Sequence, residues 1–302
     1  MHVKWLAGLA LVAAFLPWTA SGAEPSEAEI LEKAREAAIA DARDMRSAYG
    51  KGILLVRRKA RADEKEVVQS EGTFELFWKE GRCRLDLHLT RHRVRVVTLG
   101  KEDEAGQEGD LKGERRVILG DADSGTVVTF SPRIHPTGCQ IENYGSLDDA
   151  IAFAEFPFRH PAHLWQDVLN VDRLITNLDG DPIAFADGKN GRLEGRYRVK
   201  NSKKSHGVFE IDPRTGYRVT SHQTLVDPST TPLVEKQVVW GLAESVWFVK
   251  ELHLTERFGG EGETRTSVTY TTFAPNQKVD DAVFDLKSLE IPARTRELDR
   301  SK

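Results

Sequence analysis

Apolar and polar residues alternate with a period of two along most of the chain after residue 52, which predicts antiparallel strands with one wet face. The clearest alternation lies at residues 82–89, where Cys83 and three leucines face one way and charged or polar residues face the other. About eleven strands are expected, at residues 53–58, 67–79, 82–98, 115–119, 126–131, 192–200, 207–212, 217–226, 234–240, 246–258 and 264–273. A sheet this wide has to curl or split, because each strand twists against the next.

A helical segment precedes the strands. Ser26 and Glu29 form a capping-box pattern, in which each side chain accepts from a free backbone N–H of the first turn. Gly50 and Gly52 are expected to end the helix. Its apolar stripe is small and rich in alanine, so the helix should lie close against a flat surface such as a sheet; the stripe comprises Leu31, Ala34, Ala38, Ala42, Met45 and Tyr49.

A pair of helices is expected to interrupt the strands near the middle of the chain. The first is predicted to begin at the capping motif Ser146–Asp149 and to end before Pro157. The second is predicted to begin at His160–Pro161, because proline favours the first turn of a helix. Outside these elements, residues 102–110 are predicted to form an acidic loop and residues 279–284 a short closing turn.

The first 23 residues have the order of a secretory signal peptide. Lys4 supplies a positive charge, residues 5–16 are apolar, Pro17 follows, and residues 20–23 are small. The apolar run is shorter than the ~20 residues that a membrane-spanning helix needs. We therefore expect a periplasmic or secreted protein that does not span a membrane, with residues 24–302 as a single β-rich domain.

The formal net charge of the chain is −4, and charged residues make up 30% of it. This mildly acidic surface argues against nucleic acid as a partner, since binding to phosphates requires clustered cations. The chain has two cysteines, Cys83 and Cys139. An exported protein can keep a disulfide, so these two residues are the candidate bridge; the alternative is two separately buried thiols.

Three stretches resemble the periplasmic lipoprotein-carrier, or LolA-like, superfamily. Residues 74–86 look like its paired strands with an Arg-x-Asp ending, residues 209–216 like its Ile-Asp-Pro-x-x-Gly hairpin, and residues 283–292 like its C-terminal Phe-x-Leu…Ile-Pro closure. The resemblance implies an α+β, mainly antiparallel fold. Its sheet would be a strongly curved, half-open barrel covered by the N-terminal helix and the central helical pair.

The resemblance also implies a function class. Members of this superfamily hold acyl chains or hydrophobic partner segments inside the curve, and others act as periplasmic sensors or adaptors. The superfamily has no shared catalytic residues, and no cofactor is implied. The expected partner is a hydrophobic ligand or a lipoprotein, with an envelope protein as a further possibility.

Ordinary turns and surface residues explain the candidate metal and enzyme motifs of the sequence. His88 and His92 are four apart on a strand, which would place them on one face, but no third zinc ligand is positioned beside them. A second pair, His160 and His163, has the same shortcoming. The calcium-loop pattern starting at Asn177, Asp179 and Asp181 lacks the required glycine and the closing glutamate. Motifs for nucleophilic, zinc, nucleotide or dinucleotide chemistry are missing from the sequence.

The leading hypothesis is a non-enzymatic binding protein whose curved sheet holds a lipid, an acyl chain or a hydrophobic segment. Trp165, on the predicted second central helix, and Trp78, on the sheet, are expected to border the hollow. The remaining candidate lining residues are Phe74, Leu76, Leu164 and Val168. One alternative is an envelope interaction, sensor or adaptor protein with a filled core that binds a partner protein. A second alternative is a hydrolase that the sequence does not reveal.

Overall fold

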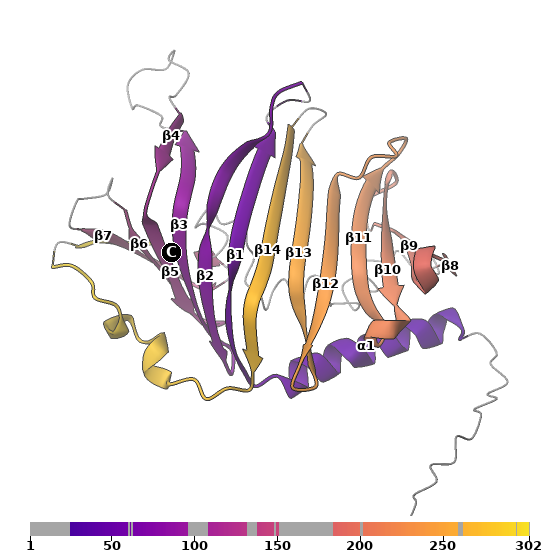
Figure 1. Cartoon of the computed structure of the whole chain (residues 1–302), viewed down its shortest axis with the longest axis horizontal. Helices are drawn as coiled ribbons and strands as arrows, with labels where there is room; N and C mark the ends of the chain where they lie inside the picture. The colour runs from indigo at the N-terminus through magenta and orange to yellow at the C-terminus, as the bar shows by residue number, and fades with distance from the viewer. Residues whose placement is uncertain are drawn as a thin grey trace, which may run out of the picture.

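The computed structural model describes residues 25–59, 61, 63–95, 108–131, 138–147, 149–150, 184–199, 202–258, 262–293 and 295–301. Its strands form one sheet in the order β15-β7-β6-β5-β3-β2-β1-β14-β13-β12-β11-β10-β9-β8, and β4 pairs with β3 beside this path. All pairings are antiparallel except that of β15 with β7. The sheet is not closed, because β15 and β8 lie at its two edges (Figure 1).

The strands β1 to β7 are Ser47–Lys59, Val67–Lys79, Arg82–Arg95, Glu108–Leu111, Glu114–Gly120, Gly125–Phe130 and Cys139–Tyr144. The strands β8 to β15 are Ala184–Asp187, Leu193–Arg198, Ser205–Asp212, Arg218–Val226, Val234–Ala243, Val246–Phe258, Gly262–Pro275 and Thr295–Asp299. The helices are α1 (Glu27–Asp44) and the short 3₁₀ turns η1 (Lys189–Gly191), η2 (Pro213–Thr215), η3 (Asp281–Phe284) and η4 (Leu286–Ser288).

Helix α1 begins as the sequence predicts and ends earlier. The backbone N–H of Glu29 donates to Ser26 Oγ at 3.3 Å, and the Ser26 N–H donates to the Glu29 carboxylate at 2.7 Å. The helix ends at Asp44, and Ser47 already belongs to β1, so the prediction that it continues to Tyr49 is wrong. Gly50 therefore lies inside a strand, where its missing Cβ makes room for the ring of Tyr270.

The described residues contain fifteen strands, which is more than the eleven or so expected. The additional strands are short: β4 lies where an acidic loop was predicted, and β7, β8 and β15 were not predicted at all. Four to six residues carry too little alternation to identify a strand from sequence. The edge strand β15 forms by parallel pairing with β7, from which it is distant in the chain.

The register separates two faces of the sheet. One row of residues that pair directly across neighbouring strands runs through Phe209, His222, Lys236, Leu254, Thr266, Val56 and Ser70. We call the face that carries this row the inner face. Helix α1 packs on it at the β10–β11 end, through Ile30 and Ala34 against Phe209 and Ile211 (Figure 1). The prediction that the alanine-rich helix lies against the sheet is confirmed.

The other side of the sheet, the outer face, is covered at β5–β7 by the C-terminal segment. Leu289, Leu286 and Ile291 pack there against apolar residues that include Val117 and Val128. Arg84 fastens the same segment, because it donates to the Val283 carbonyl at 3.0 Å and to Ser288 Oγ at 2.9 Å. The predicted closing turn is confirmed as η3.

Cys83 and Cys139 are free thiols, so of the two alternatives the structure has the two separately buried thiols and not the bridge. Cys83 belongs to the apolar cluster of the inner face, and Cys139 belongs to the cluster of the outer face. The sheet itself separates them. Cys139 is instead next to Thr295 of β15, with Sγ and Oγ1 3.3 Å apart.

The central helical pair lies almost entirely outside the described residues. A helical turn begins at Leu147, and the Asp149 N–H donates to Ser146 Oγ at 3.1 Å, as the capping motif predicts. Leu147 and Ala150 pack into the inner-face cluster. Residues 151–183, which include the predicted second helix, are not among those that the structure describes.

Candidate functional site

The middle of the inner face carries a cluster of buried apolar side chains, which we call the central cluster. Period-two alternation builds it, because every second side chain of each strand points to the same face. Its buried members are Leu54, Val56, Phe74, Leu76, Cys83, Leu85, Leu87, Leu89, Ile118, Val127, Tyr144, Leu147, Ala150, Val238, Trp240, Val249, Leu252, Val268 and Tyr270. Side chains from segments far apart in sequence therefore meet on one surface.

The structure brings together only part of the predicted lining. Phe74 and Leu76 lie in the central cluster and are 1% and 3% exposed. Trp78 is half-buried near the end of β2, in register with Cys83. The other three predicted residues, Leu164, Trp165 and Val168, lie outside the described residues. The expected hollow between Trp78 and Trp165 therefore remains a prediction.

Sequence reasoning missed an aromatic group around Phe74. The ring of Tyr270 stands edge-on to Phe74, with centroids 5.1 Å apart, and edge-on to Phe273 at 5.5 Å. Phe273 stacks on Phe248 at 4.3 Å. The alternation of residues 264–273 indicated a strand, but it could not show that these rings meet Phe74 of β2. The signal that was available is Gly50, which interrupts an apolar run where a neighbouring ring needs space.

The hydroxyl group of Tyr270 is buried in this aromatic group and has no hydrogen-bond partner among the residues that the structure describes. The residue is 6% exposed. A Cβ on Gly50 would lie 2.6 Å from Cε1 of Tyr270, so the ring lies directly over β1. Burial raises the pKa of the Tyr270 hydroxyl far above its ordinary value, and the nearby Cys83 thiol adds to this effect.

A buried ion pair joins α1 to the end of the inner face that the helix covers. Arg218 of β11 donates through Nε to Asp41 of α1 at 2.8 Å and through Nη2 to the other carboxylate oxygen. Its guanidinium lies 5.0 Å from the ring centroid of Trp247 and 5.8 Å from that of Trp240. Burial raises the pKa of Asp41, against hydrogen bonds from Arg218 that lower it. The pair fixes α1 on the sheet, because a buried guanidinium needs its carboxylate.

The β9–β11 part of the inner face, which we call the lateral cluster, contains the half-buried Tyr197. The Tyr197 hydroxyl and His222 Nε2 are 2.6 Å apart, and their rings stack with centroids 5.9 Å apart. Desolvation lowers the pKa of His222 to about 4, and Lys236 contributes in the same direction. Burial raises the pKa of Tyr197 to about 12. At neutral pH the pair is therefore a neutral hydrogen bond between phenol and imidazole.

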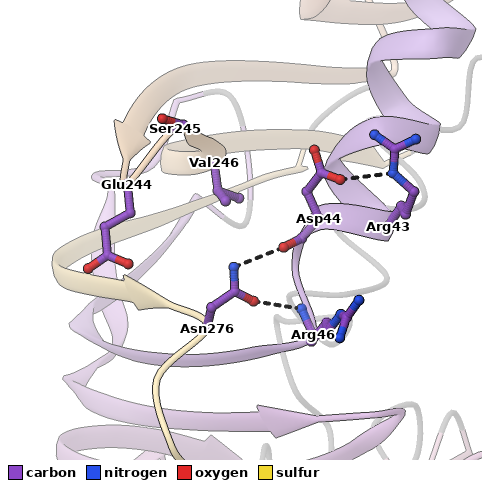
Figure 2. A pocket seen from close by; sticks show the side chains of 7 residues that line it. All are labelled: Arg43, Asp44, Arg46, Glu244, Ser245, Val246 and Asn276. Carbon is purple, nitrogen blue, oxygen red and sulfur yellow. Dashed lines mark hydrogen bonds and ion pairs between the residues drawn. The ribbon is translucent and has the colours of Figure 1, made fainter.

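A polar hollow of about 390 Å³ lies beside the end of α1, at the turn between β12 and β13 (Figure 2). Asn276 bridges its wall, since it accepts from the Arg46 N–H at 2.9 Å and donates to the Asp44 carbonyl at 2.9 Å. Arg43 is paired with Asp44 at 2.9 Å. The side chains of Arg46 and Glu244 also line the hollow. The mixture of charges suits a small polar molecule and not an apolar chain.

The predicted histidine pair on β3 is separated by a bulge. The pairing of β2 with β3 shifts between Glu71 and Gly72, so His88 and His92 point to opposite faces. His88 is exposed, whereas His92 is buried and its Nδ1 lies 2.8 Å from Ser70 Oγ. The prediction that both share one face is therefore wrong, because an extra residue at a bulge reverses the alternation.

Among the described residues, no group of three or more His, Cys, Asp or Glu side chains could hold a metal ion. The other candidate ligands, His160, His163, Asn177, Asp179 and Asp181, lie outside the part of the chain that the structure describes. Over that same part, no helix is long and apolar enough to cross a membrane.

No family model matches the chain, and no curated protein matches it in sequence. Solved structures do resemble it. A DUF1329 family protein from Desulfovibrio piger has a TM-score of 0.48 at 11% identity, over 86% of this chain and 99% of that one. A putative outer membrane lipoprotein-sorting protein domain from Vibrio parahaemolyticus has a TM-score of 0.45 at 11% identity, over 85% and 98%.

A LolA superfamily protein from Nitrosomonas europaea has a TM-score of 0.39 at 12% identity, over 88% of this chain and 100% of that one. Among the described residues, the chain itself forms an open and mainly antiparallel sheet with few helices.

Proposed function

We propose that this protein is a non-enzymatic binding protein that holds a lipid, an acyl chain or a hydrophobic protein segment on the central cluster of its inner face. The observation that supports the proposal is the extent of this buried apolar cluster, which runs across β1–β3, β5, β6 and β12–β14. Burial of apolar surface contributes about 25 cal/mol per Å², so a long acyl chain can be held without a charged contact.

The placement of the covering elements supports the same proposal. Among the described elements, α1 packs on the inner face at the β10–β11 end, and the turn at Leu147–Ala150 packs at the β6 end. These two elements lie at opposite sides of the central cluster. A ligand would take its place between them, over β1, β2 and β14.

The test is binding of a fluorescent fatty acid to the purified full-length protein and to two variants of adjacent residues. Trp78→Ala alters the inner face of β2, and Phe77→Ala is the matched control, because Phe77 is also half-buried but lies on the outer face against Tyr49. We expect Trp78→Ala to weaken probe binding more than Phe77→Ala does. Trp165→Ala should weaken binding as well, if that side chain borders the hollow.

The opposite outcome supports a second function. The aromatic group of Phe74, Tyr270, Phe248 and Phe273 already fills much of the central cluster with the protein's own side chains. If the wild-type protein binds no apolar probe, the filled-core alternative takes precedence. The protein would then be an envelope interaction, sensor or adaptor protein that contacts a partner protein.

We also propose a periplasmic or secreted location, on the basis of the signal-peptide pattern of residues 1–23. The protein purified from the envelope fraction should begin near Ala23 or Glu24. N-terminal sequencing that finds Met1 retained would contradict this proposal.

A further inference from the structure

The polar hollow at the end of α1 is lined by charged groups of both signs. Arg43 and Arg46 lie on one side of it, and Glu244 lies on the other, in the two-residue turn between β12 and β13 (Figure 2). Its volume of about 390 Å³ falls within the range of ~300–1,000 Å³ that is typical of small-molecule sites. The hollow therefore has the size for a small ligand, and its lining favours a polar one.

Two of the charges in the hollow are available to a ligand. The Arg43 guanidinium donates to the Asp44 carboxylate at 2.9 Å, so the charges of this pair offset each other. Within the part of the chain that the structure describes, the side chains of Arg46 and Glu244 have no ion pair, and both are exposed. One cation and one anion thus remain, on opposite sides of a hollow whose lining has no net charge.

The turn that carries Glu244 has an unusual sequence for its backbone. Glu244 and Ser245 have φ angles of 47° and 70°, with the positive sign that a type I′ hairpin turn requires and that Asn and Gly adopt best. The turn between β2 and β3 also has positive φ at both positions, but there a glycine, Gly81, follows Glu80. Asn276 lines the same hollow and has φ 56°. Residues held in this region of φ cluster at ligand sites, which supports a binding role for the hollow.

We propose that the hollow binds a small zwitterion, with a carboxylate or phosphodiester group against Arg46 and a primary ammonium group against Glu244. A guanidinium can donate two parallel hydrogen bonds to either oxyanion, and an ammonium group has three N–H donors for a carboxylate. A ligand without net charge also matches the neutral lining. A short peptide and a phosphoethanolamine headgroup both have this chemistry. The proposal does not depend on the proposed function, because no apolar chain has to enter the central cluster.

The test is calorimetric titration of the purified protein at low ionic strength with two pairs of probes. Glycylglycine and glycerophosphoethanolamine carry both charges. N-acetylglycylglycine lacks the ammonium group, and glycerophosphocholine has a quaternary ammonium group without N–H donors. Exposed ion pairs contribute modestly, so a zwitterion should bind about three- to fivefold more tightly than its partner probe. The pair of probes that shows this difference identifies the source of the ligand, peptide or headgroup.

Two substitutions assign the charges of the ligand to the two side chains. Glu244→Gln should abolish the preference for the zwitterion and leave the affinity for the partner probe unchanged. Arg46→Gln should weaken both probes of a pair alike, because both keep the anionic group. Glu80→Gln is the matched control, since Glu80 is an exposed carboxylate with positive φ in the turn between β2 and β3, and it should bind as the wild-type protein does. Circular dichroism should show that all three variants are folded, because no ion pair is lost.

Three outcomes would overturn the proposal: binding of neither zwitterion, equal affinity for each zwitterion and its partner probe, or a preference that persists in Glu244→Gln. Each of them leaves the proposed function standing, because fatty-acid binding to the central cluster is measured separately. Loss of fatty-acid binding in the wild-type protein would likewise leave the site in the hollow unaffected.

Discussion

Tyr197 and Tyr270 use the same structural device in two regions of one sheet face. Each ring lies over a glycine of a neighbouring strand: a Cβ would come within 2.1 Å of Tyr197 at Gly207 and within 2.6 Å of Tyr270 at Gly50. Their hydroxyl groups differ. That of Tyr197 is bonded to His222 in the lateral cluster, whereas that of Tyr270 is buried in the central cluster and has no partner in the described part of the chain.

The difference concerns how polar groups are matched within the protein. In the lateral cluster, α1 covers the sheet and the ion pair of Asp41 with Arg218 holds it in place. Tyr197 and Arg218 therefore both have partners within the protein. In the central cluster the Tyr270 hydroxyl has no such partner among the described residues, which is unusual for a buried polar group.

The largest expected effects come from truncating one large buried ring in each region. Phe74→Ala and Phe209→Ala should each lower the free energy of unfolding by about 3–5 kcal/mol, because both side chains are 1% exposed. Urea unfolding measures this. The milder variants Phe74→Leu and Phe209→Leu should separate the regions, with apolar probe binding weakened by the first and unchanged by the second. Equal loss of probe binding in Phe74→Leu and Phe209→Leu would contradict the difference between the central and lateral clusters.

The lateral cluster should contribute a pH effect through His222. The pKa of His222 is about 4 in the folded protein against an ordinary value of 6.5. Below pH 6.5 the unfolded chain takes up a proton that the folded protein does not accept until pH 4. The free energy of unfolding should therefore fall by about 2–3 kcal/mol between these values and should be largest above pH 6.5.

This pH effect is measured by urea unfolding at several pH values with two variants. His222→Gln keeps a side chain that can bond to Tyr197 but cannot titrate, so its unfolding free energy should change less across this window. His253→Gln, on the outer face of β13, should keep the wild-type pH dependence. The assignment to His222 is wrong if both variants retain the full slope.

Removing one hydroxyl should affect the two tyrosines differently. Tyr197→Phe leaves a ring nitrogen of His222 without its partner and should cost about 1–3 kcal/mol of stability. Tyr270→Phe breaks no bond and should leave the melting temperature unchanged or raise it slightly. Thermal unfolding followed by circular dichroism gives both values. Equal destabilisation by the two substitutions would contradict the contrast.

The smallest effect concerns the thiols. Cys83 in the central cluster and Cys139 on the outer face are both buried and unbonded to each other. Burial also raises the pKa of the Cys83 thiol, which suppresses the reactive thiolate. A thiol reagent should therefore react with two thiols only after unfolding, and reductant should not change the melting temperature. A difference in mobility between reducing and non-reducing gels would show instead that the two cysteines form a disulfide.

Local patterns identified much of the architecture correctly. The capping box at Ser26 gave the start of α1, and the turn at residues 212–216 forms with Gly216 in the left-handed region at φ 68°. The long strands β2, β3, β13 and β14 follow the alternation in the sequence, since a side-chain period of two is a local property of the backbone. Phe74 and Leu76 were placed on the buried face for the same reason.

Features that depend on neighbouring strands were not predictable in this way. The bulge that separates His88 from His92 depends on the pairing of β2 with β3, and β15 exists only because β7 offers it an edge. The stop signal at Gly50 was misread as the end of a helix, because a glycine that accommodates a distant ring looks the same in sequence as one that ends a helix.

The sequence by itself determined which residues alternate, where helices and turns begin, and that one face of the sheet is apolar, because these properties arise between residues close in the chain. Only the tertiary structure decided which strands lie side by side. That choice placed the two cysteines on opposite faces, gave the Tyr197 hydroxyl a histidine, and left the Tyr270 hydroxyl unbonded among aromatic rings. Each of these outcomes depends on pairing between strands distant in sequence, for which the chain carries no local signal.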